Sequence, residues 1–210
     1  MSSRVSGTTL LELIVSLSLL VIVTAMIIAL FIPSMSLFRR QSGKSDAYRG
    51  CLMLMEKFRI GLMNTQLETV TVAPTGHTIS WQKFEEAQPF SGATGDALMS
   101  PDFLILHYQE DEERVYLKEY RSSTAAPSDE PSALTQAELT SAVGANSERS
   151  WVLARNIVEF AISDKDDTFD ILEPPLSLAI TCQYDTKGTA TNDFERFSLE
   201  TNVTPRSARW

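Results

Sequence analysis

Residues 7–33 read GTTLLELIVSLSLLVIVTAMIIALFIP, and this stretch decides the fold of the chain. Leu13–Ile32 carries no formal charge over twenty residues, the length that a helix needs to cross the hydrocarbon core of a bilayer. Glu12 stands directly before this run. An ionisable group near the bilayer centre costs roughly 2.5–3.5 kcal/mol, so a carboxylate here is a functional hypothesis by default. The stretch predicts a membrane-spanning helix with a functional acidic residue at its start.

Three other interpretations of this segment are open. A secretory signal peptide would use Arg4 as its positive end and Val23-Thr24-Ala25 as its cleavage site. Against it, Glu12 interrupts the apolar region, and the apolar run continues for seven residues past Ala25. An unprocessed signal anchor is the second interpretation. A helix buried in a soluble protein is the third, and the length of the run disfavours it.

The polar leader that ends in Gly7, with Glu12 at the fifth position of the following helix, resembles the class III signal of type IV pilins and pseudopilins. The resemblance implies that a prepilin peptidase cleaves after Gly7 on the cytoplasmic face and that the exposed amine of Thr8 is then methylated. The family usually begins its mature chain with Phe, where this chain has Thr8.

In a pilin-like subunit, the resemblance implies, Glu12 pairs with the free amine of Thr8 on a neighbouring subunit and sets the register of assembly. Opposite charges in a low dielectric recover part of their desolvation cost only by meeting. The alternative is a carboxylate held at the headgroup boundary without a role.

Length and charge limit the remaining possibilities. Without the apolar segment, the 210-residue chain has enough residues for one compact domain. A net charge of −9 argues against a nucleic-acid surface, which needs a basic patch. Arg4 precedes the apolar run and Arg39 and Arg40 follow it, so positive charges do not decide the topology. The resemblance implies a single-pass protein of the cytoplasmic (inner) membrane whose C-terminal domain is periplasmic or extracellular.

A second helical segment follows the apolar run. Pro33 is expected to kink or interrupt the helix there. Apolar residues then recur at three- and four-residue intervals, which predicts one buried stripe packed on a sheet: Tyr48, Cys51, Leu52, Met55, Phe58 and Leu62. Met53, Met55 and Met63 are expected to pack in the core rather than to form a binding groove.

Two hairpins are expected in the middle of the chain. Glu68–Ala73 and Thr78–Lys83 flank the turn residues 74–77, and Phe103–Gln109 and Arg114–Arg121 flank the acidic residues 110–113. The acidic residues are interpreted as a solvated hairpin tip.

The last third of the chain alternates between apolar and polar residues. The apolar positions are Val158, Phe160 and Ile162 in 156–163, Leu176, Leu178, Ile180, Cys182 and Tyr184 in 176–184, and Phe197, Leu199 and Val203 in 195–203. This alternation predicts antiparallel strands with one wet and one dry face. A single sheet needs a cover for its dry face, and the amphipathic half of the first helix is expected to supply it.

The sequence therefore predicts an α+β fold, with a long N-terminal helix packed on a C-terminal antiparallel β-sheet. Residues 1–7 are the expected leader, 8–33 the transmembrane half of the helix and 34–65 its amphipathic half. Residues 66–210 form the β-rich domain, with an irregular, exposed excursion at 122–150 that contains a helical stretch at 135–143.

The order of the last strands extends the resemblance. A strand like Trp151–Ser163, then one led by Pro174-Pro175, then a closing strand that ends near Val203 are similar to the J-class minor pseudopilin of type II secretion. They are also similar to the related minor pilins of type IV systems.

Two further groups of residues are candidate sites. Cys51 and Cys182 are expected on facing apolar surfaces, as a disulfide or as two separate buried thiols. Asp164, Asp166, Asp167 and Asp170 form an acidic turn that is a weak calcium candidate, because the glycine and the terminal bidentate glutamate of an EF-hand loop are missing. A solvated turn is the preferred interpretation.

The chain shows no sign of catalysis. His77 and His107 lie thirty residues apart, and the sequence contains no G-x-S-x-G, H-E-x-x-H, C-x-x-C or phosphate-binding motif. We therefore expect no enzyme, no cofactor and no resident metal.

The expected function is that of a structural minor pseudopilin or minor pilin, built into the tip or initiating complex of a type II secretion pseudopilus or a type IV pilus. The implied partners are other pilin-like subunits, a prepilin peptidase, the inner-membrane assembly machinery and the membrane, but not nucleic acid. The alternatives are a pilus-tip adhesin or receptor-binding module, with the excursion at 122–150 carrying specificity, and a membrane-anchored domain that shares only the signal.

Overall fold

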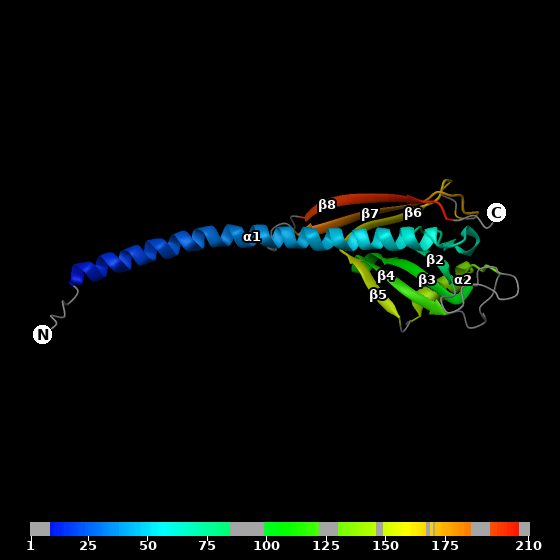
Figure 1. Ribbon diagram of the computed structural model, residues 1–210, viewed down its shortest axis with the longest axis horizontal. Helices are drawn as coiled ribbons and strands as arrows, with labels where there is room; N and C mark the ends of the chain where they lie inside the picture. Colours follow the sequence, from blue (N-terminus) through cyan, green and yellow to red (C-terminus); the bar gives the residue numbers. More distant parts are fainter. Residues whose placement is uncertain are drawn as a thin grey trace.

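The computed structural model describes residues 9–84, 99–121, 130–145, 149–166, 169, 171–185 and 194–205. A long N-terminal helix, α1 (Leu10–Met63), extends from one end of a β-rich domain (Figure 1). The fold is α+β, as predicted. Residues 9–42 are all exposed, and the described part of the domain packs on the second half of α1.

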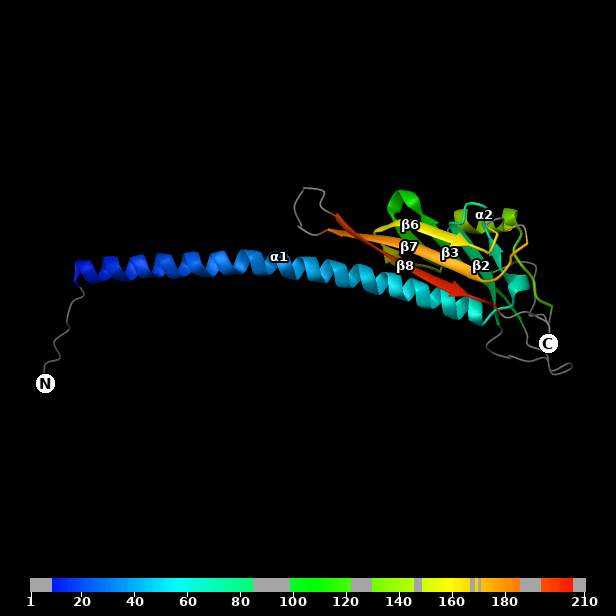
Figure 2. The same ribbon diagram turned by 90° about the horizontal axis from the view of Figure 1, so that it is seen from above.

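The interruption expected at Pro33 is wrong, because α1 runs through it as one continuous helix. Figure 2 shows a gentle curve along its length. A proline removes only one hydrogen bond of the helix, here the one that the Ala29 carbonyl would accept, so the helix can continue past it. The hydroxyls of Ser34 and Ser36 donate to the carbonyls of Leu30 and Pro33, both at 2.7 Å.

The buried stripe of α1 differs from the predicted one. Its members follow each other at intervals of three or four residues: Ala47, Cys51, Leu54, Phe58 and Leu62. Tyr48 and Leu52 were expected inside but are 45% and 43% exposed, and Met55 is only partly buried. Spacing alone admits either stripe, because Leu52 and Leu54 both follow a helical period; the position of the sheets selects Leu54.

The strands form two antiparallel sheets rather than the single sheet that was expected. The first has the order β1-β2-β3-β4-β5 and the second β6-β7-β8. Their bounds are β1 Thr71–Val72, β2 Thr78–Phe84, β3 Met99–Gln109, β4 Arg114–Arg121, β5 Ser150–Arg155, β6 Ile157–Ser163, β7 Leu176–Asp185 and β8 Phe194–Val203. Both predicted hairpins are present, as β1–β2 around residues 73–77 and as β3–β4 around the 3-10 turn η2 (Glu110–Glu112).

The chain passes from the first sheet to the second at Asn156, so the single strand expected at 151–163 is two strands. Asn156 has a φ of 58°, a left-handed conformation that asparagine tolerates better than most residues. The register against β7 then shifts between Ile157 and Glu159. This irregularity buries Ile157 in place of Val158, which was expected to point inward and is only partly buried.

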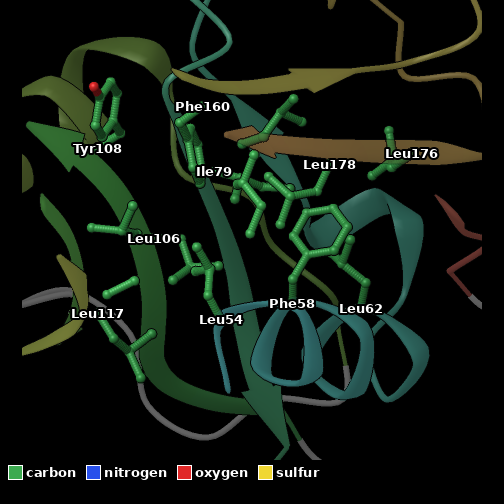
Figure 3. Packing of buried hydrophobic residues seen from close by; sticks show 14 of the residues in the cluster. Leu54, Phe58, Leu62, Ile79, Leu106, Tyr108, Leu117, Phe160, Leu176 and Leu178 are labelled. Atoms are coloured by element: carbon green, nitrogen blue, oxygen red, sulfur yellow. The ribbon is translucent and has the colours of Figure 1, made fainter. Parts of the chain in front are cut away.

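The main core lies where α1 meets both sheets. The second half of α1 runs between them, with β6–β8 on one side and β2–β5 on the other (Figure 1). In Figure 3 the side chains of Leu54, Phe58 and Leu62 point from α1 towards residues of both sheets. The predicted alternation of β7 is confirmed, since Leu176, Leu178, Ile180, Cys182 and Tyr184 are all at least 96% buried. The helix is therefore the shared centre of the domain.

The two sheets are also joined by backbone hydrogen bonds at the edge of β6. Ile157 N–H donates to the Glu113 carbonyl at 3.0 Å, and Ile162 N–H donates to the Gly76 carbonyl at 2.9 Å. Gly76 has a φ of 69°, and a Cβ there would lie 2.9 Å from the Ile162 carbonyl oxygen. Glycine at this turn therefore allows the close approach of the sheets.

The segment expected as an exposed excursion packs one face on the domain, although most of its described residues are exposed. Helix α2 (Gln136–Gly144) lies on the face of the first sheet opposite α1 and buries Leu139 and Ala142 against Phe103 and Ile105. Thr135 closes a capping box with Glu138, which satisfies free N–H groups of the first turn. Residues 122–129 and 146–148 of the excursion lie outside the described residues.

Candidate functional site: the long helix and the groove beside it

The apolar half of α1 has no partner among the described residues. α1 is long and apolar enough to cross a membrane by length and composition. Its first helical residues include Glu12, which is exposed and whose N–H bonds the Thr9 carbonyl at 3.0 Å. The predicted processing residues, Gly7 and Thr8, lie outside the described residues.

A second apolar surface, which no described residue covers, continues along α1 beside the domain. Leu52, Met53, Ile60 and Met63 are 43–52% exposed. The expectation that Met53 and Met63 pack in the core is therefore wrong. Between them, Lys57 and Glu56 keep the surface soluble, as expected for the outer face of a helix. Among the described residues, nothing covers these apolar side chains, and such a surface is typical of a contact site for another polypeptide or a lipid.

A groove of about 630 Å³ lies between this helix surface and the first sheet. α1 contributes Met53, Lys57, Ile60 and Gly61, and the sheet contributes Trp81, Lys83, Leu104, Leu117, Glu119, Trp151, Val152 and Leu153. Trp151 is 48% exposed, whereas Trp81 is 3% exposed. The groove exists because α1 covers only part of the apolar face of the five-stranded sheet.

Sequence reasoning missed this groove. The signal was present in strand periodicity, because Trp81 pairs with Leu104 and Leu117 pairs with Trp151 across the sheet. Cross-strand partners share a face. The strand periodicity does not show how much of that face α1 covers.

Charged groups line one wall of the groove. Glu119 accepts hydrogen bonds from Lys83 and from Arg149, each at 3.1 Å. Burial raises the pKa of the Glu119 carboxyl, but the hydrogen bonds from Arg149 and Lys83 and their positive charges outweigh burial and lower the pKa overall. The carboxylate is therefore held ionised beside an apolar surface.

Cys51 and Cys182 form a disulfide that joins α1 to β7 across a sequence separation of 131. Both residues are fully buried in the main core. The crosslink ties α1 to the second sheet one helical turn after Ala47, the first buried residue of the helix.

The acidic turn is described only in part. Asp164 is 6% exposed, and its Oδ2 accepts a long hydrogen bond of 3.5 Å from Glu173 N–H. Lys165 pairs with Glu173 at 3.0 Å, and this contact raises the pKa of the lysine. Asp167 and Asp170 lie outside the described residues. Among the residues that are described, no three potential ligands gather as a metal site requires, and the choice between a solvated turn and the weaker calcium candidate stays untested.

The two histidines have structural contacts. His107 Nδ1 lies 2.9 Å from the Thr78 hydroxyl, and the His77 ring packs edge-on against Tyr108. Burial lowers the pKa of His107, and the positive charges of Lys118 and His77 lower it further. His107 is therefore held neutral near pH 7.

Comparisons with known proteins add no family to this geometry. No protein-family model, curated protein or solved structure matches the chain. The long helix, its acidic start and the groove are therefore the features of this protein that bear on its function.

Proposed function

We propose that this protein is a structural subunit of the minor pseudopilin or minor pilin type, which assembles into the tip or initiating complex of a secretion pseudopilus or a pilus. The observation that carries the proposal is the continuity of α1. One unbroken helix bears Glu12 at its start, an apolar run of membrane length that no described residue covers, and an apolar surface that is exposed beside the described part of the domain.

The membrane half of α1 has two environments in which it is stable. Lipid covers its side chains before assembly, and parallel helices of neighbouring subunits cover them afterwards. Transfer between the two costs little, because lipid tails are as apolar as leucine and packing alone distinguishes them. The membrane half of α1 can therefore move from lipid into a helical fibre core with little change in free energy.

Glu12 gives this process its specificity. Placing its carboxylate at the edge of the hydrocarbon costs free energy. Only a nearby positive charge, such as the amine of a processed neighbouring subunit, offsets this cost. The exposed surface of Leu52, Met53, Ile60 and Met63 then contacts the next subunit outside the membrane. Both contacts lie on one helix, so a neighbour that satisfies one is positioned for the other.

The first experiment separates insertion from assembly. Glu12→Ala is expected to insert into membranes as well as the parent protein or better, because an intramembrane carboxylate is removed, while its crosslinking to pilin-like partner subunits falls at least tenfold. Asp46→Ala is the matched control, since Asp46 is an exposed carboxylate on α1 outside both the apolar run and the surface of Leu52, Met53, Ile60 and Met63. Undiminished crosslinking of Glu12→Ala would contradict the register role.

A second experiment tests processing. The intact mass of the protein extracted from membranes is expected to correspond to a chain that begins at Thr8. A mature chain that begins at Met26 would instead identify a secretory signal peptide and end the proposal.

A further inference from the structure

The second sheet ends in a long strand with an open edge. β8 (Phe194–Val203) pairs with β7 on one side, and no strand of the described residues pairs with its other side. The opposite edge of the same sheet, β6, is closed by the hydrogen bonds of Ile157 and Ile162 to the first sheet. An edge strand presents a row of unpaired N–H and C=O groups with which another chain can pair. The sheet can therefore be extended at β8.

The apolar face of β8 is incompletely covered. The inward side chains of β7 are at least 96% buried. Phe197 and Leu199, the corresponding apolar side chains of β8, are only partly buried. β8 runs alongside the second half of α1 (Figure 2), with no described strand on its outer side. A further strand beside β8 would complete this cover.

A row of apolar side chains on α1 lies next to the open edge. Tyr48 packs on Phe197 with ring centroids 5.8 Å apart, which places this turn of α1 beside β8. Leu52 and Met55 follow Tyr48 at intervals of four and three residues and so lie on the same side of the helix. Tyr48 and Leu52 are exposed and Met55 is partly buried. The apolar stripe of the sequence is therefore wider than the part of α1 that the two sheets cover.

A positive charge ends this row. Arg59 follows Met55 by four residues, is exposed, and has no ion-pair partner among the described residues. Tyr48 and Arg59 are about 16 Å apart along the helix, at roughly 1.5 Å per residue. Three alternate side chains of one strand span about 13 Å, at ~3.3 Å per residue. Two apolar side chains and one carboxylate on the same face of a strand therefore match the row.

We propose that β8 accepts a strand from another polypeptide, whose side chains towards α1 are apolar, apolar and acidic in the direction from Tyr48 to Arg59. Backbone pairing supplies affinity in such strand addition, and the alternate side chains supply specificity. β8 runs in the same direction as this row, so an antiparallel strand carries its acidic residue at its N-terminal end. The inference rests on the proposed function only in that Leu52 contacts another subunit, and it names the secondary structure and the charge of that contact.

The test uses the full chain in phosphatidylcholine nanodiscs and a fluorescent peptide, Thr-Glu-Thr-Val-Thr-Val-Thr. Fluorescence anisotropy measures binding, with empty nanodiscs as the background. Two further peptides carry N-methyl groups, one on the glutamate and both valines, the other on the last three threonines. The N–H groups of alternate residues point to opposite edges of a strand, so only one of these two sets faces β8.

The unmethylated peptide and one methylated peptide are expected to bind, whereas the other methylated peptide should bind at least about tenfold more weakly. Leu52→Asp should also weaken binding by about tenfold or more, because it places a carboxylate against a valine. Ile171→Asp is the matched control, since Ile171 is an exposed apolar residue in the connection between β6 and β7 and not on α1. This variant should bind the peptide like the parent protein.

The charge pair is tested by a double-mutant cycle. Glutamine in place of the peptide glutamate should weaken binding to the parent protein by about two- to fivefold and should have no effect on binding to Arg59→Ala.

Equal affinities of the two methylated peptides would overturn the proposal, because a helix or an irregular segment does not distinguish the two edges of a strand. Absence of saturable binding at about 1 mM peptide would overturn it as well. Neither Glu12 nor cleavage at Gly7 enters this measurement. Its failure therefore leaves the proposed function intact, and failure of the Glu12 and processing experiments leaves the strand site intact.

Discussion

Gly61 offers the sharpest test of how α1 sits on the first sheet. A Cβ added at this position would lie 2.4 Å from Trp81 Cζ2 and 2.6 Å from Cε2. Separations below 3.0 Å do not occur between real atoms of this kind, so the helix or the indole must move. Gly61→Ala therefore changes both the helix and the wall of the groove.

Two opposing contributions set the magnitude. Alanine is favoured over glycine inside a helix by about 0.5–1 kcal/mol. Overpacking of a well-packed site costs about 1–3 kcal/mol. Trp81 is 3% exposed and so has little room to move. We expect Gly61→Ala to lower the free energy of unfolding by about 1 kcal/mol.

Gly50→Ala is the matched control on the same helix. A Cβ there would meet Ala154 Cα at 3.5 Å and the Leu153 carbonyl oxygen at 3.6 Å, which are ordinary contacts. Only the helix-propensity gain remains, so this variant should be more stable by about 0.5–1 kcal/mol. The two alanine variants are thus expected to differ by about 2 kcal/mol.

The assay is urea unfolding of the fragment that begins at Ser42, with far-ultraviolet circular dichroism as the probe of the transition. Trp81→Phe, which makes room beside the helix, should reduce the cost of Gly61→Ala. Stabilisation by Gly61→Ala equal to that by Gly50→Ala would refute the close approach of helix and indole. An unchanged cost in the Trp81→Phe background would refute the steric explanation.

Three further predictions test the core, the crosslink and the acid response. Deletion through Gln41 should leave a soluble, folded fragment, whereas deletion through Met63 removes all five buried side chains of α1 and should cause aggregation. Sedimentation of both fragments measures their solubility, and equal solubility would contradict a core shared between α1 and the sheets. Labelling of the unfolded, unreduced domain should find no thiol at Cys51 or Cys182, and reduction should lower the free energy of unfolding by about 2–4 kcal/mol; two reactive thiols would exclude the disulfide. The lowered pKa of His107 means that the unfolded chain binds a proton more readily than the folded one, so the free energy of unfolding should fall as the pH decreases below about 6.5. The dependence of this free energy on pH should be weaker in His107→Asn, and an unchanged dependence would assign the titration to another group.

Much of the secondary structure was predictable because its signals are local. The apolar run of α1, the turn residues of the two hairpins and the alternation of β7 each specify an element within a few residues of sequence. Thr135 and Glu138 likewise mark the start of α2 by a capping box that needs no distant partner. Glu12 was identifiable as a candidate for the same reason, since a charge beside an apolar run is visible in the sequence alone.

Only the tertiary structure decided which of the possible faces are buried. Periodicity allowed Leu52 as readily as Leu54, and the position of α1 between two sheets chose Leu54. The division of the strands at Asn156 depends on one backbone conformation and a register shift, neither of which alters the apolar pattern. The groove lined by Trp151 and Met53 arises because one helix is narrower than a five-stranded sheet. A sequence records which side chains are apolar, whereas coverage of a surface depends on elements that are distant in the chain and meet only in three dimensions.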